Sequence, residues 1–213
     1  MKNLAVVICM TLLASTTMIA QDSNSILNEL SKKAKGYTSI AADYESRLLD
    51  VQAGLDISQS GSIIVSGEKY NLDLSDYVIV NDGETFWSFD KAGNTVQIDY
   101  AEDMTDDSLQ PSQMFTIWEQ DFKNEYKGET TENGKACHVI YLYPNDPTSK
   151  PYHTIQLSID KAKMEVVKIV VKGREGQDMI YNVNSFNPNE GVTKSDFIFD
   201  TNSYPGVEVI DNR

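Results

Sequence analysis

The chain has 213 residues and a formal net charge of −14, from 32 acidic residues against 18 Lys and Arg. So acidic a protein repels phosphate backbones and anionic headgroups, which excludes nucleic acid as an expected partner and flat electrostatic binding to an anionic membrane. The length suits one domain with a sizeable core.

Residues 1–20 have the pattern of a secretory signal peptide. Lys2 supplies a positive start, residues 4–19 are apolar apart from small polar residues, and Ala20 precedes a polar run. The apolar run is short and no stop-transfer charge follows, which argues against a transmembrane helix. We therefore expect export to the periplasm, cleavage near Ala20, and one mature domain of residues 21–213.

The two cysteines indicate a domain without disulfides. Cys9 lies in the middle of the apolar run rather than behind a small-residue box at its end, so we expect the mature protein not to be acylated. Cleavage would leave Cys137 alone, and an intramolecular disulfide is then impossible. The mature domain must be stabilised by its own core.

The mature chain begins with one predicted helix and continues as strands. Residues 23–35 carry apolar side chains at helical spacing, Ser23 or Ser25 is the expected N-cap, and Gly36 ends the helix. Alternating apolar and polar side chains then predict strands at residues 40–48, 62–66, 70–74, 77–80, 85–89 and 95–100.

Residues 101–127 interrupt the strands. An acidic cluster opens the segment, and it lacks the glycine and the regular spacing of a cation-binding loop, so we expect no metal there: Glu102, Asp103, Asp106 and Asp107. A helix is predicted to start at Pro111 and to carry the most apolar-aromatic stretch of the mature chain: Met114, Phe115, Ile117, Trp118 and Phe122.

Strands resume after this segment. Asn133-Gly134 is a predicted turn between residues 126–131 and 136–143, and further strands are expected at residues 155–159, 166–171, 179–183, 197–199 and 207–210. The sequence therefore predicts about ten antiparallel strands in one meander, which closes its edges best as a barrel or half-barrel.

Three stretches of the sequence resemble the periplasmic outer-membrane lipoprotein carrier family, the LolA-like proteins. The first is Gly61-Ser62-Ile63-Ile64-Val65 followed by Val80-Asn81-Asp82-Gly83-Glu84-Thr85-Phe86-Trp87-Ser88-Phe89. The second is residues 111–118 with Asp121-Phe122, where the family has a covering helix. The third is Phe197-Ile198-Phe199-Asp200 followed by residues 204–211, similar to a Phe-x-Phe strand and a Gly-Val-x-Val segment.

The resemblance implies a mainly β (α+β) fold, an unclosed antiparallel β half-barrel with helices covering its concave apolar face. It implies a carrier that holds lipoprotein acyl chains in that cavity and shuttles them from the inner to the outer membrane. The implied partners are an inner-membrane lipoprotein-releasing complex and an outer-membrane acceptor, and we expect a monomer.

One position departs from the family pattern. Family members with a described lid have an Arg on the second strand that bonds to the covering helices. The matching position here falls near Gly67, and Lys69 is the basic residue nearby. The latch of the lid is therefore expected to differ in this chain.

A lipid carrier needs a concave apolar surface with few polar groups, and no catalytic group or cofactor. The expected lining comes from the inward-facing positions of the early strands and from the underside of the helix at residues 111–118. The residues are Ile40, Tyr44, Leu48, Tyr70, Leu72, Leu74, Trp87, Phe89, Met114, Phe115, Ile117 and Trp118. The same side chains would also suit a filled core.

The residues give little support to an enzyme. The chain has two histidines, His138 and His153, and no HExxH, GxSxG or Gly-rich phosphate loop. Cys137 and His138 are neighbours, but adjacent residues on a strand point to opposite faces and cannot form a nucleophile–base pair. Three alternatives to a carrier stay open: a periplasmic lipid-sensing or regulatory binding module on the same fold, a hydrolase, and a structural domain with a filled interior.

Overall fold

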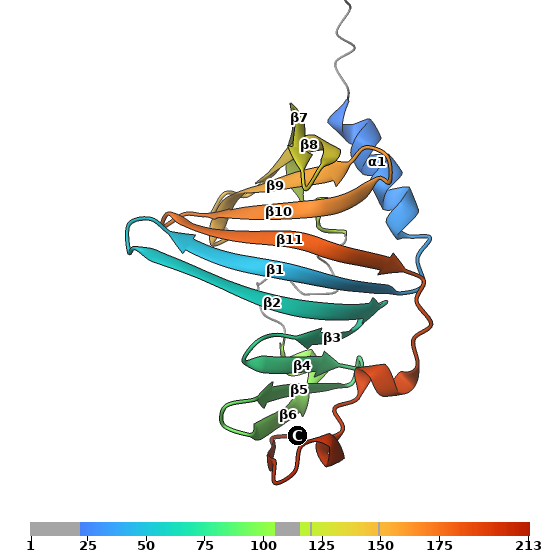
Figure 1. Ribbon diagram of the computed structural model, residues 1–213, viewed down its shortest axis with the longest axis vertical. Coiled ribbons are helices and arrows are strands. Elements are labelled where there is room, and N and C mark those ends of the chain that lie inside the picture. Colours follow the sequence, from blue (N-terminus) through green and yellow to red (C-terminus); the bar gives the residue numbers. More distant parts are fainter. Residues whose placement is uncertain (1–21, 105–115, 120, 149) are drawn as a thin grey trace, which may run out of the picture.

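The structure is a computed structural model that describes residues 22–104, 116–119, 121–148 and 150–213 (Figure 1). The expected signal peptide, and Met114 and Phe115 of the expected lining, lie outside the described residues. Within the described residues, no helix has both the length and the apolar character needed to cross a bilayer.

Helix α1 spans Ser23–Ala34 and confirms the predicted N-terminal helix. Its cap is Asp22 rather than a serine: the Asp22 carboxylate accepts a hydrogen bond from the Asn24 backbone N–H at 3.1 Å. Ile26, Leu27 and Leu30 are buried, so one apolar stripe of the helix packs against the sheet.

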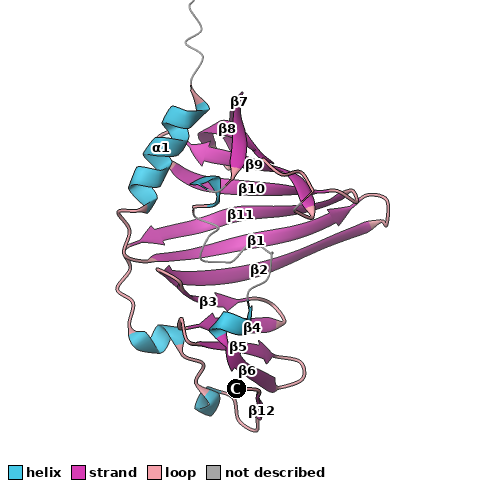
Figure 2. Ribbon diagram, turned by 180° about the vertical axis from the view of Figure 1, so that it is seen from behind, coloured by secondary structure: helices cyan, strands magenta, loops and turns pink. Residues whose placement is uncertain are grey.

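Twelve strands form one unclosed sheet in the order β12-β6-β5-β4-β3-β2-β1-β11-β10-β9-β8-β7 (Figures 1 and 2). Adjacent strands are antiparallel, except that β12 runs parallel to β6. The strands are β1 Ile40–Asp50, β2 Leu55–Ser66, β3 Lys69–Asp73, β4 Tyr77–Asn81, β5 Thr85–Asp90, β6 Thr95–Tyr100, β7 Phe122–Glu132, β8 Lys135–Pro144, β9 Tyr152–Asp160, β10 Glu165–Gly173, β11 Gln177–Pro188 and β12 Glu208–Asp211.

Two meanders meet in the middle of this sheet. Strands β1 to β6 form one meander and β7 to β11 the other, and they join where β1 pairs with β11 along its whole length. The predicted Asn133-Gly134 turn between β7 and β8 is confirmed, with positive φ at both residues (49° and 77°), as a tight hairpin requires. The predicted mainly β, unclosed sheet is thus present, but two expectations need correction: β12 is parallel to its neighbour, and two meanders take the place of one.

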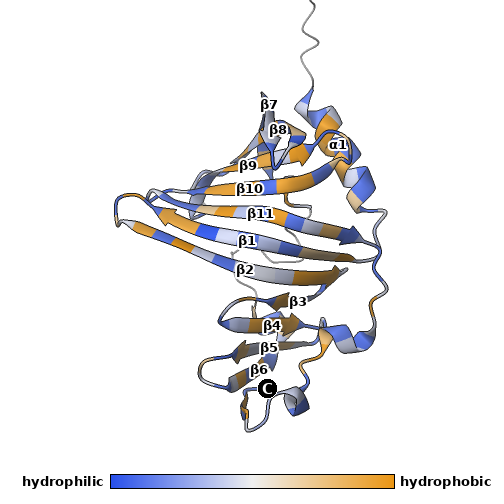
Figure 3. Cartoon of the chain, viewed as in Figure 1, coloured by the Kyte–Doolittle hydropathy of each residue, from blue (hydrophilic) through white to orange (hydrophobic). Residues whose placement is uncertain are grey.

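The side of the sheet on which α1 packs is called the α1 face below. One buried cluster on this face joins α1 to β8, β9 and β10 through residues such as Leu30, Leu142 and Leu157. A second cluster gathers β1 to β5 around Ala42, Ile63 and Tyr70. Figure 3 shows apolar and polar residues interspersed along the central strands β1, β2 and β11.

A third cluster lies on the opposite side of β4, β5 and β6. Phe86 belongs to the α1-face cluster and Phe89 to this one, because the two residues have opposite parity on β5. The C-terminal segment covers the third cluster: the Phe89 ring lies 5.1 Å from the Phe199 ring and 4.3 Å from the Tyr204 ring, centroid to centroid.

Two sequence-based expectations about local structure are wrong. The stretch Phe197 to Phe199 is not a strand, since a 3-10 helix spans Lys194–Phe197 and the Phe199 side chain is buried in the third cluster. The predicted helix does not reach Phe122, because a 3-10 helix spans Ile117–Glu119 and Phe122 begins β7. The helix expected from Pro111 lies largely outside the described residues, so covering by that segment stays a prediction.

Candidate functional site

A continuous row of apolar side chains crosses six strands of the α1 face. Each member is directly opposite the next in the strand register, and directly opposite residues share a face of the sheet. In order from β2 to β8 the row consists of Ile57, Leu48, Met179, Val171, Ile155 and Leu142.

The exposure of this row changes from one end to the other. Leu142 and Ile155 are fully buried in the cluster that includes residues of α1, and Val171 is 9% exposed. Leu48 and Met179 are half-buried, and Ile57 is 47% exposed. The row is therefore buried at the β8 end and open to solvent at the β2 end, where Leu55 is also exposed.

A pair of tyrosines lies between the two apolar clusters of the α1 face. The rings of Tyr44 on β1 and Tyr181 on β11 meet edge to face with centroids 6.2 Å apart. Tyr44 also lies over Gly61 of β2, where an added Cβ would approach the Tyr44 hydroxyl to 2.7 Å. Burial raises the pKa of both tyrosines, so the pair stays neutral and adds no charge to this face.

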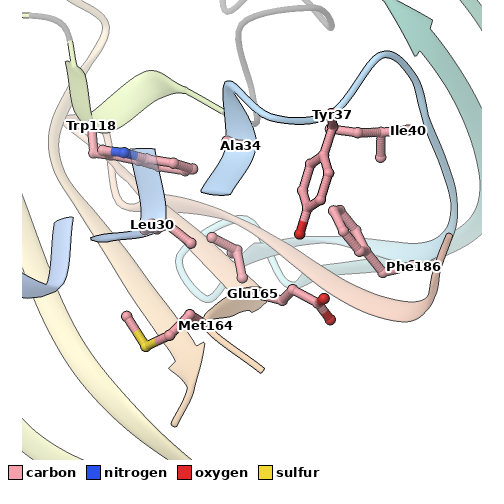
Figure 4. Close-up of a pocket in the computed structure, with 9 residues that line it drawn as sticks. Leu30, Ala34, Tyr37, Ile40, Trp118, Met164, Glu165 and Phe186 are labelled. Carbon is pink, nitrogen blue, oxygen red and sulfur yellow. The ribbon is translucent and has the colours of Figure 1, made fainter. Parts of the chain in front are cut away.

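An apolar hollow lies under the C-terminal half of α1 (Figure 4). Leu30 and Ala34 of α1 face Trp118, Val166 and Phe186 across it, and the Tyr37 and Phe186 rings lie side by side. Its volume is about 20 Å³, roughly the room for one water molecule. A lipid chain requires hundreds of Å³, so this hollow must widen before it holds one.

Polar contacts hold α1 over this hollow at its C-terminal end. Lys33 forms an ion pair of 3.1 Å with Glu165 and also donates to the backbone carbonyl of Lys163. Lys35 forms an ion pair of 2.9 Å with Glu119. Although burial opposes it, hydrogen bonds from Lys35 and Ser31 hold the pKa of Glu119 below its usual value.

Two further hydrogen bonds complete the attachment of α1. The indole N–H of Trp118 donates to the Ser31 hydroxyl at 2.7 Å, and the Ser23 hydroxyl donates to the Asn124 side chain on β7 at 2.5 Å. Helix α1 is therefore fastened at both ends by groups on the helix itself and on its neighbours. None of these contacts involves Gly67, near which the Arg of the family would fall, or the neighbouring Lys69.

The structure brings most of the expected lining residues to the α1 face. Leu48 lies in the apolar row, Ile40 lines the hollow under α1, and Ile117 and Trp118 are buried in the cluster beneath α1. Tyr44, Tyr70 and Leu72 belong to the β1–β5 cluster on the same face. Whether any of these residues binds lipid stays a prediction.

Two expected lining residues lie elsewhere. Trp87 and Phe89 occupy the opposite side of β5, where they pack under the C-terminal segment, so the expectation of one shared face is wrong for them. Leu74 lies beyond the end of β3, where it lines a separate hollow together with Tyr44, Gly61 and Asp73.

Sequence reasoning missed the open end of the row. Ile57 was outside every predicted strand, because the strand preceding Gly67 was expected to start at Ser62 rather than at Leu55. The alternation of Leu55 and Ile57 with Asp56 and Ser58 is the signal that extends the strand. Met179 was expected on a strand, but its position opposite Leu48 follows only from the register of β11 on β1.

The groups considered for catalysis are held apart. Cys137 is fully buried, and burial raises the pKa of its thiol. The His138 side chain points to the opposite side of β8 from Cys137, and its Nδ1 lies 3.3 Å from the hydroxyl oxygen of Tyr126. Among the described residues, no group of three or more His, Cys, Asp or Glu side chains could hold a metal ion.

Comparison with known families assigns the class of protein. The model of the outer membrane lipoprotein carrier protein LolA matches residues 71–200, which is more than half of the chain. The chain therefore belongs to the LolA family, a lipoprotein carrier family that is typically periplasmic. The resemblance noted in the sequence is confirmed.

Solved structures agree with this fold. An uncharacterized conserved protein from Thermus thermophilus superposes with a TM-score of 0.57 at 10% identity, over 90% of this chain and 100% of that one. MucB gives a TM-score of 0.53 at 15% identity, over 89% and 65% of the two chains. LprF from Mycobacterium bovis gives 0.52 at 15% identity, over 79% and 93%. Identities this low show the fold alone, and no curated protein matched the chain.

Proposed function

We propose that this protein is a periplasmic carrier that binds the acyl chains of lipoproteins and shuttles them from the inner to the outer membrane. The observation that carries the proposal is the apolar row from Leu142 to Ile57, which is buried at one end and open to solvent at the other. Membership of the LolA family supports the same role.

The row is long enough to hold an extended lipid chain. Six strands at roughly 4.8 Å spacing place its two ends about 24 Å apart. An acyl chain spans one leaflet of a bilayer, about half of the ~30 Å hydrocarbon core. Each buried CH₂ contributes about 0.8 kcal/mol, so an acyl chain laid along the row binds without a charged or catalytic group.

Loading requires α1 to move. The hollow beneath α1 is about 20 Å³ and shares no residue with the row, so a chain that extends from the row into this hollow must displace Leu30 and Trp118. Because Trp118 is bonded to Ser31 of α1, the helix and the 3-10 turn at Ile117–Glu119 move together in this account. These two segments act as the lid, with residues 111–115 as the expected continuation.

The remaining parts of the proposal follow the family. The protein acts without catalysis or cofactor, residues 1–20 are removed on export, and residues 21–213 act as one monomeric domain. An inner-membrane lipoprotein-releasing complex loads the carrier, and an outer-membrane acceptor unloads it.

Substituting neighbouring leucines of β1 tests the site. Leu48 belongs to the row, whereas Leu49 points to the opposite side of the same strand and is half-buried like Leu48. A buried carboxylate beside an acyl chain is costly, so Leu48→Glu should weaken palmitate binding by tenfold or more. Leu49→Glu should leave it within about twofold of the original.

Both variants must keep the circular dichroism spectrum of the original protein. Equal palmitate affinity in the original protein and Leu48→Glu would show that the row is not the binding surface. The same conclusion holds if Leu49→Glu is the variant that loses binding.

A further inference from the structure

Strand β2 extends well beyond its neighbour β3. It pairs with β1 over residues 55–65, but with β3 only over residues 62–66. Residues 55–61 therefore have no described strand on their outer side, and Figures 1 and 2 show the β1–β2 hairpin projecting past β3. This stretch is called the open edge of β2 below.

The hairpin geometry shows which backbone groups of the open edge face outward. Ser66 and Lys69 close the two-residue turn between β2 and β3, so this pair exchanges both of its backbone hydrogen bonds. Alternation along the strand then directs the N–H and C=O groups of Ser60, Ser58 and Asp56 away from β1. The described partner of these groups on the outer side is the Ser75 hydroxyl, which reaches the Ser60 carbonyl at 3.5 Å.

The open edge lacks the features that normally protect an exposed strand. It carries no Lys, Pro or bulge, and its single charge, on Asp56, is paired with Arg47 of β1 at 2.6 Å. Strand β7, at one end of the sheet, is different: charged side chains alternate along it, and Ser23 of α1 bonds to its Asn124. An unprotected edge of this length is suited to pairing with another extended chain.

The position of the open edge connects it to the apolar row. Ile57, the exposed end of the row, is itself a residue of the open edge. A lipid chain that lies along the row therefore leaves the sheet at β2, and any polypeptide joined to that lipid begins beside the outward-facing backbone groups of Ser58 and Ser60.

We propose that the open edge of β2 binds the extended polypeptide segment that adjoins the lipid-bearing residue of the cargo, adding it to the sheet as a strand. This inference rests on the proposed function. Main-chain pairing accepts many side-chain sequences, which suits a carrier of varied cargo. The net charge of −14 favours a neutral or basic segment and disfavours a second copy of this chain at the edge.

The test compares a lipopeptide with a free fatty acid. The lipopeptide is a diacylated cysteine followed by an uncharged Ser/Gly-rich segment as long as the open edge, and the fatty acid is palmitate. Ser58→Pro removes an N–H that points away from β1 and so leaves the β1–β2 pairing intact. The matched control, Ser58→Ala, keeps the N–H. We expect Ser58→Pro to weaken lipopeptide binding about tenfold, with palmitate binding unchanged and Ser58→Ala unaffected.

A second measurement leaves the protein unaltered. A lipopeptide in which every backbone amide of the peptide segment is N-methylated cannot donate to the edge, so we expect it to bind the original protein about tenfold more weakly than its unmethylated form. Backbone amide exchange at Ser58 and Ser60 should slow with the unmethylated lipopeptide and not with palmitate.

Three results would overturn the inference. Unmethylated and methylated lipopeptides binding equally well, with palmitate still bound, would reject strand addition while the carrier function stands. Concentration-dependent dimers abolished by Ser58→Pro would assign the edge to a second copy. Failure to bind either palmitate or lipopeptide would reject the proposed function and this inference together.

Discussion

At the scale of single residues, His138 gives the fold a dependence on pH. Burial and the nearby Lys161 cation both hold the pKa of His138 below its usual value of 6.5. As the pH falls through 6.5, His138 takes up a proton in the unfolded chain, whereas in the folded protein it takes up the proton only at a lower pH. The free energy of unfolding should therefore decrease between about pH 7 and pH 5.

The substitution His138→Gln isolates this contribution. Gln keeps a polar partner for the Tyr126 hydroxyl and does not titrate, so the variant should lose less stability than the original protein on acidification. Urea unfolding at several pH values measures both curves. If the free energy of unfolding changes with pH in parallel for the two proteins, His138 does not cause the pH dependence.

At the scale of elements, the attachment of α1 controls access to the site. Lys33→Met removes the ion pair with Glu165, which contributes up to about 1 kcal/mol, so α1 amides should exchange roughly fivefold faster while β9 and β10 amides keep their rates. Lys32→Met, on the exposed side of the same turn, is the control. If α1 moves during loading, palmitate uptake should also be faster in Lys33→Met. An unchanged uptake rate would show that movement of α1 is not needed for loading.

The C-terminal segment is expected to stabilise the sheet without taking part in binding. Phe199 is buried between Phe89 and Tyr204, on the opposite side of β5 from Phe86 of the α1-face cluster. Phe199→Ala should lower the free energy of unfolding by about 3–5 kcal/mol and leave palmitate affinity unchanged at a temperature where the variant is folded. A loss of affinity in the folded variant would mean that the two sides of the sheet act together.

Most elements could be predicted from the sequence, because their signals are local. Helical spacing placed α1, strict alternation placed strands such as β9, and Asn133-Gly134 marked its hairpin. The errors arose where tertiary packing decides. Phe199 has the local sequence of a strand residue, yet its ring packs against Phe89 from a non-strand segment. The alternation along β5 does not show on which side of the sheet α1 packs.

The candidate site could be predicted only in part for the same reason. Leu48 was expected on an apolar face, but its neighbours Met179 and Ile57 come from other strands, and Met179 lies far away in the sequence. Their alignment depends on the pairing of β1 with β11, which joins the two meanders. No local pattern contains that register, so the row and the open edge of β2 became visible only in the folded sheet.

At the scale of the whole molecule, the unclosed sheet provides two different regions on one face. The end beneath α1 is a packed core that stabilises a domain without disulfides, and the end at β2 leaves apolar side chains in contact with water. Exposing the apolar side chains of such a row to water is unfavourable in free energy unless a ligand covers them. Acyl chains are the ligand that this account assigns to them.

Native mass spectrometry of the mature protein, purified from the periplasm without detergent, tests that assignment most directly. The account predicts a co-purifying species with the mass of a lipid or lipopeptide, which is absent from Leu48→Glu although that variant keeps its fold. A bare protein mass, together with no uptake of added lipopeptide or palmitate, would contradict the carrier function and leave the LolA family assignment as a statement about the fold.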